Sequence, residues 1–267
     1  MIETYFGMKC NPFKKGFDSK KSFQFNDFNE MQARLNYLLK NKGIGLFTGS
    51  SGLGKTYSIK YFSEHLNIGL YKVVYISLST LTVRDFYKSL CFGLGITPEN
   101  GKIDMFKQIQ ETIKTYVNER KITPVIILDE AQYLRPEILN DIKMLLNFDM
   151  DSKDYAVLIL MGQPTLNNLL SRNTHEALRQ RIIINYTFAG IGKQEVQEYL
   201  ENRLKLAGMN EKMFEENAIE AIASNCNGSI RKLNTIIEKC LMICEQKEEN
   251  IVTSETVLLA ENEVNLI

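Results

Sequence analysis

One glycine-rich motif constrains the fold of this chain more than any other feature. Residues 49–56 read GSSGLGKT, a complete G-x-x-x-x-G-K-T pattern that follows the apolar run 44–48 and precedes a segment of helical period, 55–66. Glycines let the backbone N–H groups of such a loop surround phosphate oxygens, and the N-terminus of the next helix adds positive potential. The motif predicts a strand, a phosphate-binding loop and a helix. The expected nucleotide-binding residues are Gly49, Ser50, Ser51, Gly52, Leu53, Gly54, Lys55, Thr56 and Tyr57.

Two residues of the motif carry specific chemistry. We expect the ammonium group of Lys55 to reach the β and γ phosphates, and the hydroxyl of Thr56 to ligate Mg²⁺. A glycine turn that merely caps a helix is the alternative, and the order of strand, loop and helix argues against it. The predicted ligands are therefore ATP and Mg²⁺.

A second motif supplies carboxylates. The apolar run 125–128 is followed directly by Asp129 and Glu130. A buried strand of an open α/β sheet delivers such side chains to its carboxyl edge, where ligands bind. We expect Asp129 to hold Mg²⁺ through water and Glu130 to orient and deprotonate the attacking water. The pair could also be a simple cap of the next helix, but this alternative is weak beside a phosphate loop.

The pattern along the chain predicts an α/β domain followed by a helical one. Continuous apolarity is typical of strands buried on both faces of a parallel sheet. The expected strands span 44–48, 72–78, 124–130 and 155–162, and the helices between them span 55–66, 82–94, 104–120 and 136–147. Further helices are expected over 192–207, 215–225, 229–246 and 253–263. We predict a three-layer α/β sandwich with a central parallel sheet in domain 1–190, and an all-helical lid in domain 191–267, with a hinge near Gly190 and Gly192.

Charge and hydropathy argue against a strongly basic nucleic-acid-binding protein, a secreted protein and a membrane-spanning protein. The 32 Lys and Arg balance 32 Asp and Glu, so the net charge provides no strong field for holding nucleic acid or an anionic membrane, and any such surface must be local. The start of the chain lacks the features of a secretory signal, and its apolar runs are too short to span a bilayer. A soluble, cytoplasmic protein that is not bound to a membrane is expected.

Four further segments, in order along the chain, resemble the signatures of AAA+ ATPases. They are D-E-A-Q at 129–132, M-G-Q-P at 161–164, L-R-Q-R-I at 178–182 and G-S-I-R-K-L-N at 228–234. The opening residues Y-F-G-M at 5–8 and N-P-F at 11–13, taken with these, resemble the group of secretion-pathway and transposon-encoded ATPases that includes ExeA, TniB and TnsC. The resemblance implies an ATP-hydrolysing enzyme that oligomerises with nucleotide bound between subunits.

The resemblance also implies roles for individual residues. Gln163 matches the first sensor of the γ-phosphate, Arg181 the arginine finger that completes a neighbouring subunit's site, and Arg231 the second sensor. Arg179 is a rival for the finger, and each of these side chains has a plain structural alternative: a turn for Gln163, a solvated salt-bridge pair for the two arginines, and an ordinary surface position for Arg231. Pro12 and Phe13 either flank the adenine or pack against the core.

The resemblance leaves two branches open. Secretion-type members carry a membrane span and a cell-wall-binding module after the ATPase core, and the sequence to Ile267 shows neither, which favours the transposon branch. That branch implies duplex DNA and a transposase as partners, with the regulation of transposition and target selection as the function. Lys102 and Lys107 are the weak candidates for DNA contacts, and a solvated helix is the alternative for both. The rival is a secretion-pathway or regulatory ATPase whose partner is protein alone.

Overall fold

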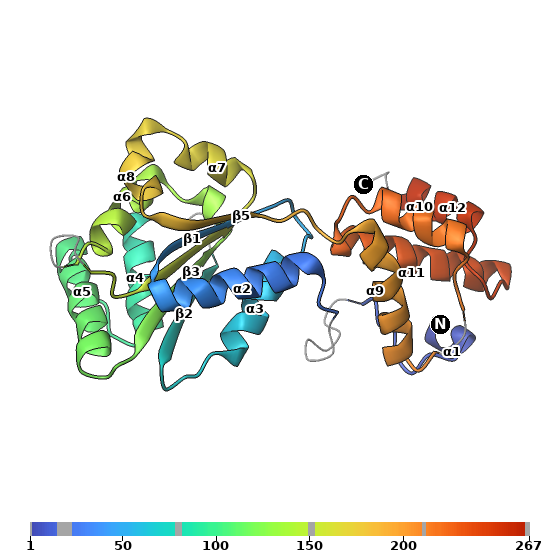
Figure 1. Cartoon of the computed structure of the whole chain (residues 1–267), viewed down its shortest axis with the longest axis horizontal. Helices are drawn as coiled ribbons and strands as arrows, with labels where there is room; N and C mark the ends of the chain where they lie inside the picture. Colours follow the sequence, from blue (N-terminus) through green and yellow to red (C-terminus); the bar gives the residue numbers. More distant parts are fainter. Residues whose placement is uncertain (1, 15–22, 78–81, 149–152, 210–211, 265–267) are drawn as a thin grey trace. The chain divides into compact units, whose positions relative to one another are not determined.

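The computed structural model describes residues 2–14, 23–77, 82–148, 153–209 and 212–264. The chain forms two compact units (Figure 1). The α/β unit comprises residues 30–50 and 55–188, and the helical unit comprises residues 1–29, 51–54 and 189–267. The chain therefore changes unit within the phosphate loop, and each unit is described by itself below.

A five-stranded parallel sheet forms the centre of the α/β unit, with strand order β2-β3-β4-β1-β5. The strands are β1 (Gly43–Thr48), β2 (Tyr71–Ser77), β3 (Thr123–Asp129), β4 (Val157–Gly162) and β5 (Ile182–Thr187). Every residue of β1 and β4 is buried, as their unbroken apolarity predicts. The four expected strands are confirmed, except that Leu78, at the end of the second, lies outside the described residues. The edge strand β5 was not among the expected strands; its apolar run is only three residues long, and its exposed residues alternate with buried or half-buried ones.

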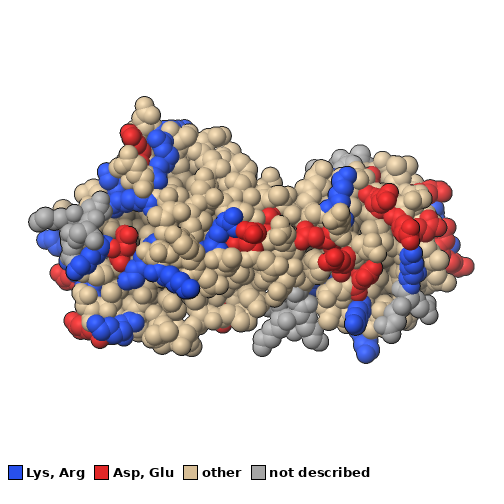
Figure 2. All heavy atoms as spheres, viewed as in Figure 1, with Lys and Arg blue, Asp and Glu red and all other residues tan. Residues whose placement is uncertain are grey.

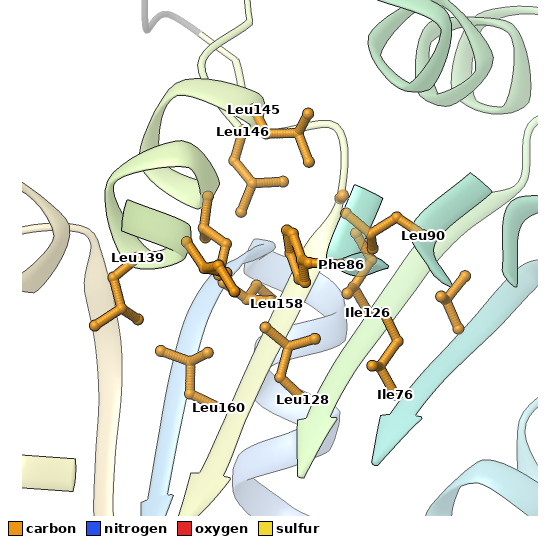
Figure 3. Packing of buried hydrophobic residues seen from close by; sticks show 14 of the residues in the cluster. Ile76, Phe86, Leu90, Ile126, Leu128, Leu139, Leu145, Leu146, Leu158 and Leu160 are labelled. Atoms are coloured by element: carbon orange, nitrogen blue, oxygen red, sulfur yellow. The ribbon is translucent and has the colours of Figure 1, made fainter. Parts of the chain in front are cut away.

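Helices cover both faces of this sheet, which confirms the three-layer α/β class. They are α2 (Asn26–Asn41), α3 (Lys55–His65), α4 (Val83–Leu94), α5 (Lys102–Asn118), α6 (Pro136–Leu145), α7 (Thr165–Leu170) and α8 (Glu176–Arg179). One face packs against α4, α5 and α6, where Phe86 and Leu90 meet side chains of the strands (Figure 3). On the other face, α2 lies so close to β1 that a Cβ on Gly45 would stand 2.7 Å from a methyl group of Leu38.

The helical unit contains α1 (Ile2–Phe6), α9 (Lys193–Leu206), α10 (Glu216–Asn225), α11 (Ile230–Lys247) and α12 (Ser254–Val264). The longest, α11, begins at an N-cap, where the Ser229 side chain accepts a hydrogen bond from the Lys232 N–H. Its buried residues recur at the helical period and include Leu233, Ile237 and Leu241. No helix in the described ranges is both long and apolar enough to cross a membrane.

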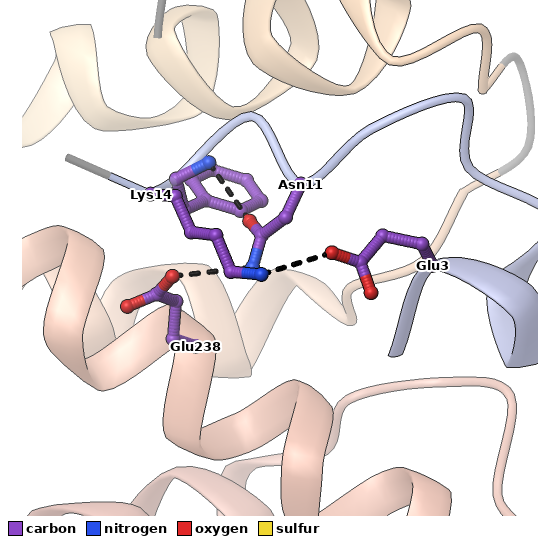
Figure 4. A network of polar contacts seen from close by, with 5 residues as sticks. Glu3, Asn11, Lys14 and Glu238 are labelled. Atoms are coloured by element: carbon purple, nitrogen blue, oxygen red, sulfur yellow. Dashed lines mark hydrogen bonds and ion pairs between the residues drawn. The ribbon is translucent and has the colours of Figure 1, made fainter. Parts of the chain in front are cut away.

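The N-terminal segment packs with the helical unit, although the predicted domain 1–190 includes it in the α/β domain. The Lys9 N–H donates to the Ala207 carbonyl at 2.9 Å, and the Asn11 amide donates to Glu238 on α11 at 3.1 Å (Figure 4). The Asn11 side-chain oxygen in turn accepts from the Phe13 N–H at 3.0 Å. The Phe13 ring is only 2% exposed, and its burial explains why the segment is held here.

The expected hinge glycines are also engaged within the helical unit. A Cβ on Gly190 would stand 2.3 Å from the Gly228 carbonyl oxygen, and the Gly190 N–H donates to Asp27 at 2.7 Å. The boundary between the units falls just before this contact, between residues 188 and 189.

The core between sheet and helices should carry much of the stability of the α/β unit. We predict that Leu158→Ala lowers the free energy of unfolding by about 2–5 kcal/mol, because it leaves a cavity among fully packed side chains. Leu70→Ala in the same unit is the control, since this leucine is 52% exposed and Leu158 only 1%. Urea denaturation of both variants measures the difference, and equal destabilisation would contradict the assignment of the core.

Candidate nucleotide-binding site

The start and the end of the phosphate loop lie in the α/β unit, where Lys55 is held by backbone carbonyls. Its side chain is only 7% exposed, and its ammonium group donates to Gly49 O at 2.6 Å and to Ser50 O at 2.8 Å. The Gly49 N–H donates to Gly162 O at the end of β4, at 3.1 Å. The loop is therefore attached to the strand beside it, and its lysine already lies within the loop.

The middle of the loop, residues 51–54, packs within the helical unit. Gly52 and Gly54 adopt φ values of 85° and 92°, a region that favours glycine. A Cβ on Gly52 would stand 2.3 Å from the Ser229 hydroxyl oxygen, so no larger residue fits there without movement. The Arg231 guanidinium donates to the Ser51 hydroxyl at 3.0 Å. The structure thus brings the predicted second sensor to the loop, while its role toward the γ-phosphate stays a prediction.

The carboxylate of Asp129, at the end of β3, receives three hydrogen bonds. Its Oδ2 accepts from the Thr56 hydroxyl at 3.1 Å and from the Tyr75 hydroxyl at 2.8 Å, and its Oδ1 accepts from the Glu130 N–H at 2.9 Å. Burial, together with the hydrogen bond to Asp129 and its charge, raises the pKa of Tyr75. The phenol therefore stays a neutral donor over the physiological pH range.

This group of oxygen atoms fits a magnesium ion. A hydroxyl and a carboxylate next to a phosphate loop are the hard oxygen donors that Mg²⁺ prefers, and it usually binds through few protein ligands, with water and substrate phosphates completing its coordination. Thr56 and Asp129 are the residues that would hold it, and their role as magnesium ligands stays a prediction. Tyr75 was not predicted, because its involvement depends on β2 being the neighbour of β3, which the sequence does not reveal.

Glu130 follows in an unusual backbone conformation. Its φ of 55° and ψ of 37° lie in the left-handed region, which is uncommon for a residue with a Cβ and costs of order 1–3 kcal/mol. Its Oε2 accepts from the Gln132 side-chain amide at 2.6 Å. The carboxylate is half-buried at the same edge of the sheet as Asp129.

Gln163 lies at this edge too, because β4 runs between β1 and β3. Its backbone N–H donates to the Gln132 side-chain oxygen at 3.0 Å, and its own side chain is half-buried. Gln132 contacts both predicted catalytic residues, Glu130 and Gln163, but the sequence motifs predict no role for it.

The two candidate arginine fingers both bind backbone carbonyls of their own chain. The Arg179 guanidinium donates to Leu170 O at 2.9 Å and to Arg172 O at 3.3 Å, and the Arg181 guanidinium donates to Lys143 O at 3.0 Å. The arginine-finger role of Arg181, with Arg179 as its rival, stays a prediction.

The remaining candidates belong to the N-terminal segment and to helix α5. Pro12 and Phe13 are buried in the helical unit, a position that suits their packing alternative. Lys102 forms an ion pair with Asp141, at 2.7 Å, and lies over the Tyr87 ring. Lys107 is exposed on α5.

Comparison with known proteins agrees with this geometry. Residues 38–170, about half of the chain, match the family model described as "AAA domain". General secretion pathway protein A of Aeromonas hydrophila is 28% identical over 99% of this chain, which spans only 49% of that protein.

Solved structures show the same fold at low identity. The Cdc6p protein of Pyrobaculum aerophilum has a TM-score of 0.64 at 18% identity, over 98% of this chain and 71% of that one. A chain of Drosophila ORC bound to DNA has a TM-score of 0.67 at 17% identity, over 97% and 64%. The RuvB branch migration motor of Thermotoga maritima has a TM-score of 0.60 at 17% identity, over 92% and 73%. With an AAA domain matched over its phosphate loop and both acidic residues, this chain is an ATPase of the AAA+ class.

Proposed function

We propose that this ATPase is a nucleotide-driven switch that assembles with ATP and presents the assembly to a partner. The observation that carries the chemistry is the carboxylate of Asp129, which binds the Thr56 hydroxyl at 3.1 Å while the next residue, Glu130, offers a second carboxylate. Asp129 thus lies beside Thr56, where the metal would bind, and the carboxylate of Glu130 is the one that can act on water.

Different residues of this chain carry out phosphate binding and water activation in the proposed hydrolysis. The loop N–H groups and Lys55 hold the phosphates, and Glu130 accepts a proton from the attacking water. Bound Mg²⁺ supplies charge neutralisation at the phosphates. We assign Gln163 to the attacking water and the γ-phosphate, Arg231 to the γ-phosphate, and Arg181 to the site of a neighbouring subunit, where a guanidinium stabilises charge that develops in the transition state.

Duplex DNA is the partner that we propose for the assembled form, with a transposase recruited to it. Two observations support DNA: the ORC structure of similar fold is bound to DNA, and the α/β unit carries more Lys and Arg than Asp and Glu. Figure 2 shows groups of Lys and Arg on the visible face of this unit, and mainly Asp and Glu on that of the helical unit. In an assembly, a weakly basic surface is repeated at every subunit, so the phosphate contacts of all subunits together would strengthen the binding of DNA.

A second candidate is a protein partner in a secretion pathway. It is favoured by the similarity to general secretion pathway protein A, which extends over 99% of this chain. The two candidates share the ATPase chemistry and differ in whether DNA is bound, so the same protein preparation can separate them.

The first prediction concerns the base. Glu130→Gln should bind ATP with nearly wild-type affinity but hydrolyse it about 10²-fold or more slowly, because the amide cannot accept the proton. Lys55→Ala should lose nucleotide binding. Phosphate release and binding of a fluorescent ATP analogue measure the two effects, and a wild-type rate for Glu130→Gln would show that the base is another group.

The second prediction concerns assembly. If an arginine completes the neighbouring site, the ATPase rate per subunit rises with protein concentration, and Arg181→Ala abolishes this rise with little change in ATP affinity. Arg179→Ala is the matched variant, since both guanidiniums bind backbone carbonyls. If only Arg179→Ala removes the concentration dependence, the two roles are exchanged.

The third prediction concerns DNA. Glu130→Gln saturated with ATP should retain duplex DNA at low salt, lose it steeply as salt rises, and show little sequence preference, because phosphate contacts position without reading bases. Lys107→Gln should weaken retention more than Lys102→Gln, since Lys102 is paired with Asp141. Lys205→Gln, an exposed lysine of the helical unit, is the control. No retention in a filter-binding assay would favour the protein partner.

A further inference from the structure

Both ends of the Gln132 side-chain amide are engaged at the catalytic edge of the sheet. The Nε2 group donates to Glu130 Oε2 at 2.6 Å, and Oε1 accepts from the Gln163 N–H at 3.0 Å. One neutral side chain therefore connects the predicted base with the residue at the end of β4.

The local backbone brings Gln132 to this position. Glu130 adopts the left-handed conformation, and a single 3₁₀ turn, Ala131–Tyr133, follows it. The Tyr133 N–H closes this turn on the Glu130 carbonyl at 3.1 Å, and Ala131 is fully buried beneath it. The turn folds the side chain of residue 132 back toward the carboxylate two positions earlier.

The end of β4 is shaped for this contact. A Cβ on Gly162 would stand 2.5 Å from Gln132 Oε1 and 3.3 Å from the Gln132 backbone nitrogen. No side chain fits there while the amide keeps its place. The glycine at 162 therefore permits the amide to reach the backbone of the strand.

The peptide group between Gly162 and Gln163, whose N–H binds Gln132, also contacts the phosphate loop. The carbonyl of the Gly162–Gln163 peptide accepts from the Gly49 N–H at 3.1 Å, while its N–H donates to Gln132. A peptide group is planar and rigid, so its two hydrogen-bonding ends move together. A continuous chain of hydrogen bonds thus joins the first residue of the loop to the carboxylate of Glu130.

We propose that Gln132 is a positioning residue that orients the Glu130 carboxylate relative to the phosphate loop. The proposal rests on the proposed function, in which Glu130 is the base. The amide holds one carboxylate oxygen, and the other is left to accept the proton of water. Because the amide is neutral, it fixes the direction of the carboxylate without cancelling its charge.

The test compares two substitutions of Gln132. Gln132→Leu removes both hydrogen bonds at similar side-chain length, and it should lower kcat about 10- to 100-fold with KM for ATP unchanged, since the base loses its orientation. Gln132→Glu places a second carboxylate against Glu130. Two adjacent carboxylates share a proton up to higher pH, so the acid limb of the kcat profile should move to higher pH.

A matched control separates this effect from general disturbance. Gln197 donates to Glu201 at 3.0 Å on an exposed face of α9, a glutamine–glutamate pair like that of Gln132 and Glu130. Gln197→Glu should leave kcat and its pH profile unchanged. Thermal denaturation of all variants shows whether each is folded, and Gln132→Glu retains the shape of the side chain if Gln132→Leu does not fold.

A double variant distinguishes failure of this inference from failure of the proposed function. Adding Gln132→Leu to Glu130→Gln should cause no further loss of kcat if Gln132 acts through Glu130. A wild-type rate for Glu130→Gln alone would overturn the assignment of the base. A slow Glu130→Gln combined with wild-type kcat and pH profile in both Gln132 variants would overturn only the positioning role. An equal loss from Gln132→Leu in both backgrounds would also overturn it.

Discussion

The parallel alignment of β1, β3 and β4 is the constraint on which the catalytic arrangement depends. Because the three strands run in the same direction, their carboxyl ends meet at one edge of the sheet, and residues separated by more than 100 positions become neighbours. The phosphate loop follows β1, Asp129 ends β3, and Gln163 follows β4. The alignment is maintained by burial of the strands on both faces, so the apolar core and the polar edge are two consequences of one packing arrangement.

Much of this arrangement could be predicted from local signals. The glycine-rich loop and the apolar strand that ends in two acidic residues can be recognised in the sequence, because the residues that carry their chemistry are consecutive. Thr56 and Asp129 lie together as expected. The expected helices of the C-terminal part were found with their ends within two residues of prediction, since their apolar periodicity is regular.

The features that were missed depend on contacts between distant segments. β5 is a half-exposed edge strand, and α2 was not among the expected helices. Tyr75 contacts Asp129 only because β2 pairs with β3 in a particular register. The place of the N-terminal segment is decided by Lys9 and Asn11, whose partners Ala207 and Glu238 lie more than 190 residues further along the chain. Neither strand order nor such long-range partners leave a periodic signal in the sequence.

The division of the phosphate loop between the two compact units has a consequence for how the protein can be dissected. Residues 49–50 and 55–56 belong to one unit, whereas residues 51–54 pack with Ser229 and Phe25 of the other. A fragment that stops before residue 189 would retain the whole GSSGLGKT motif but would lose Ser229 and Arg231, against which Gly52 is fitted. The motif is thus continuous in the sequence, but its residues belong to both compact units of the folded protein. Truncation at this boundary would yield a fragment that keeps the signature but lacks the side chains packed against Gly52.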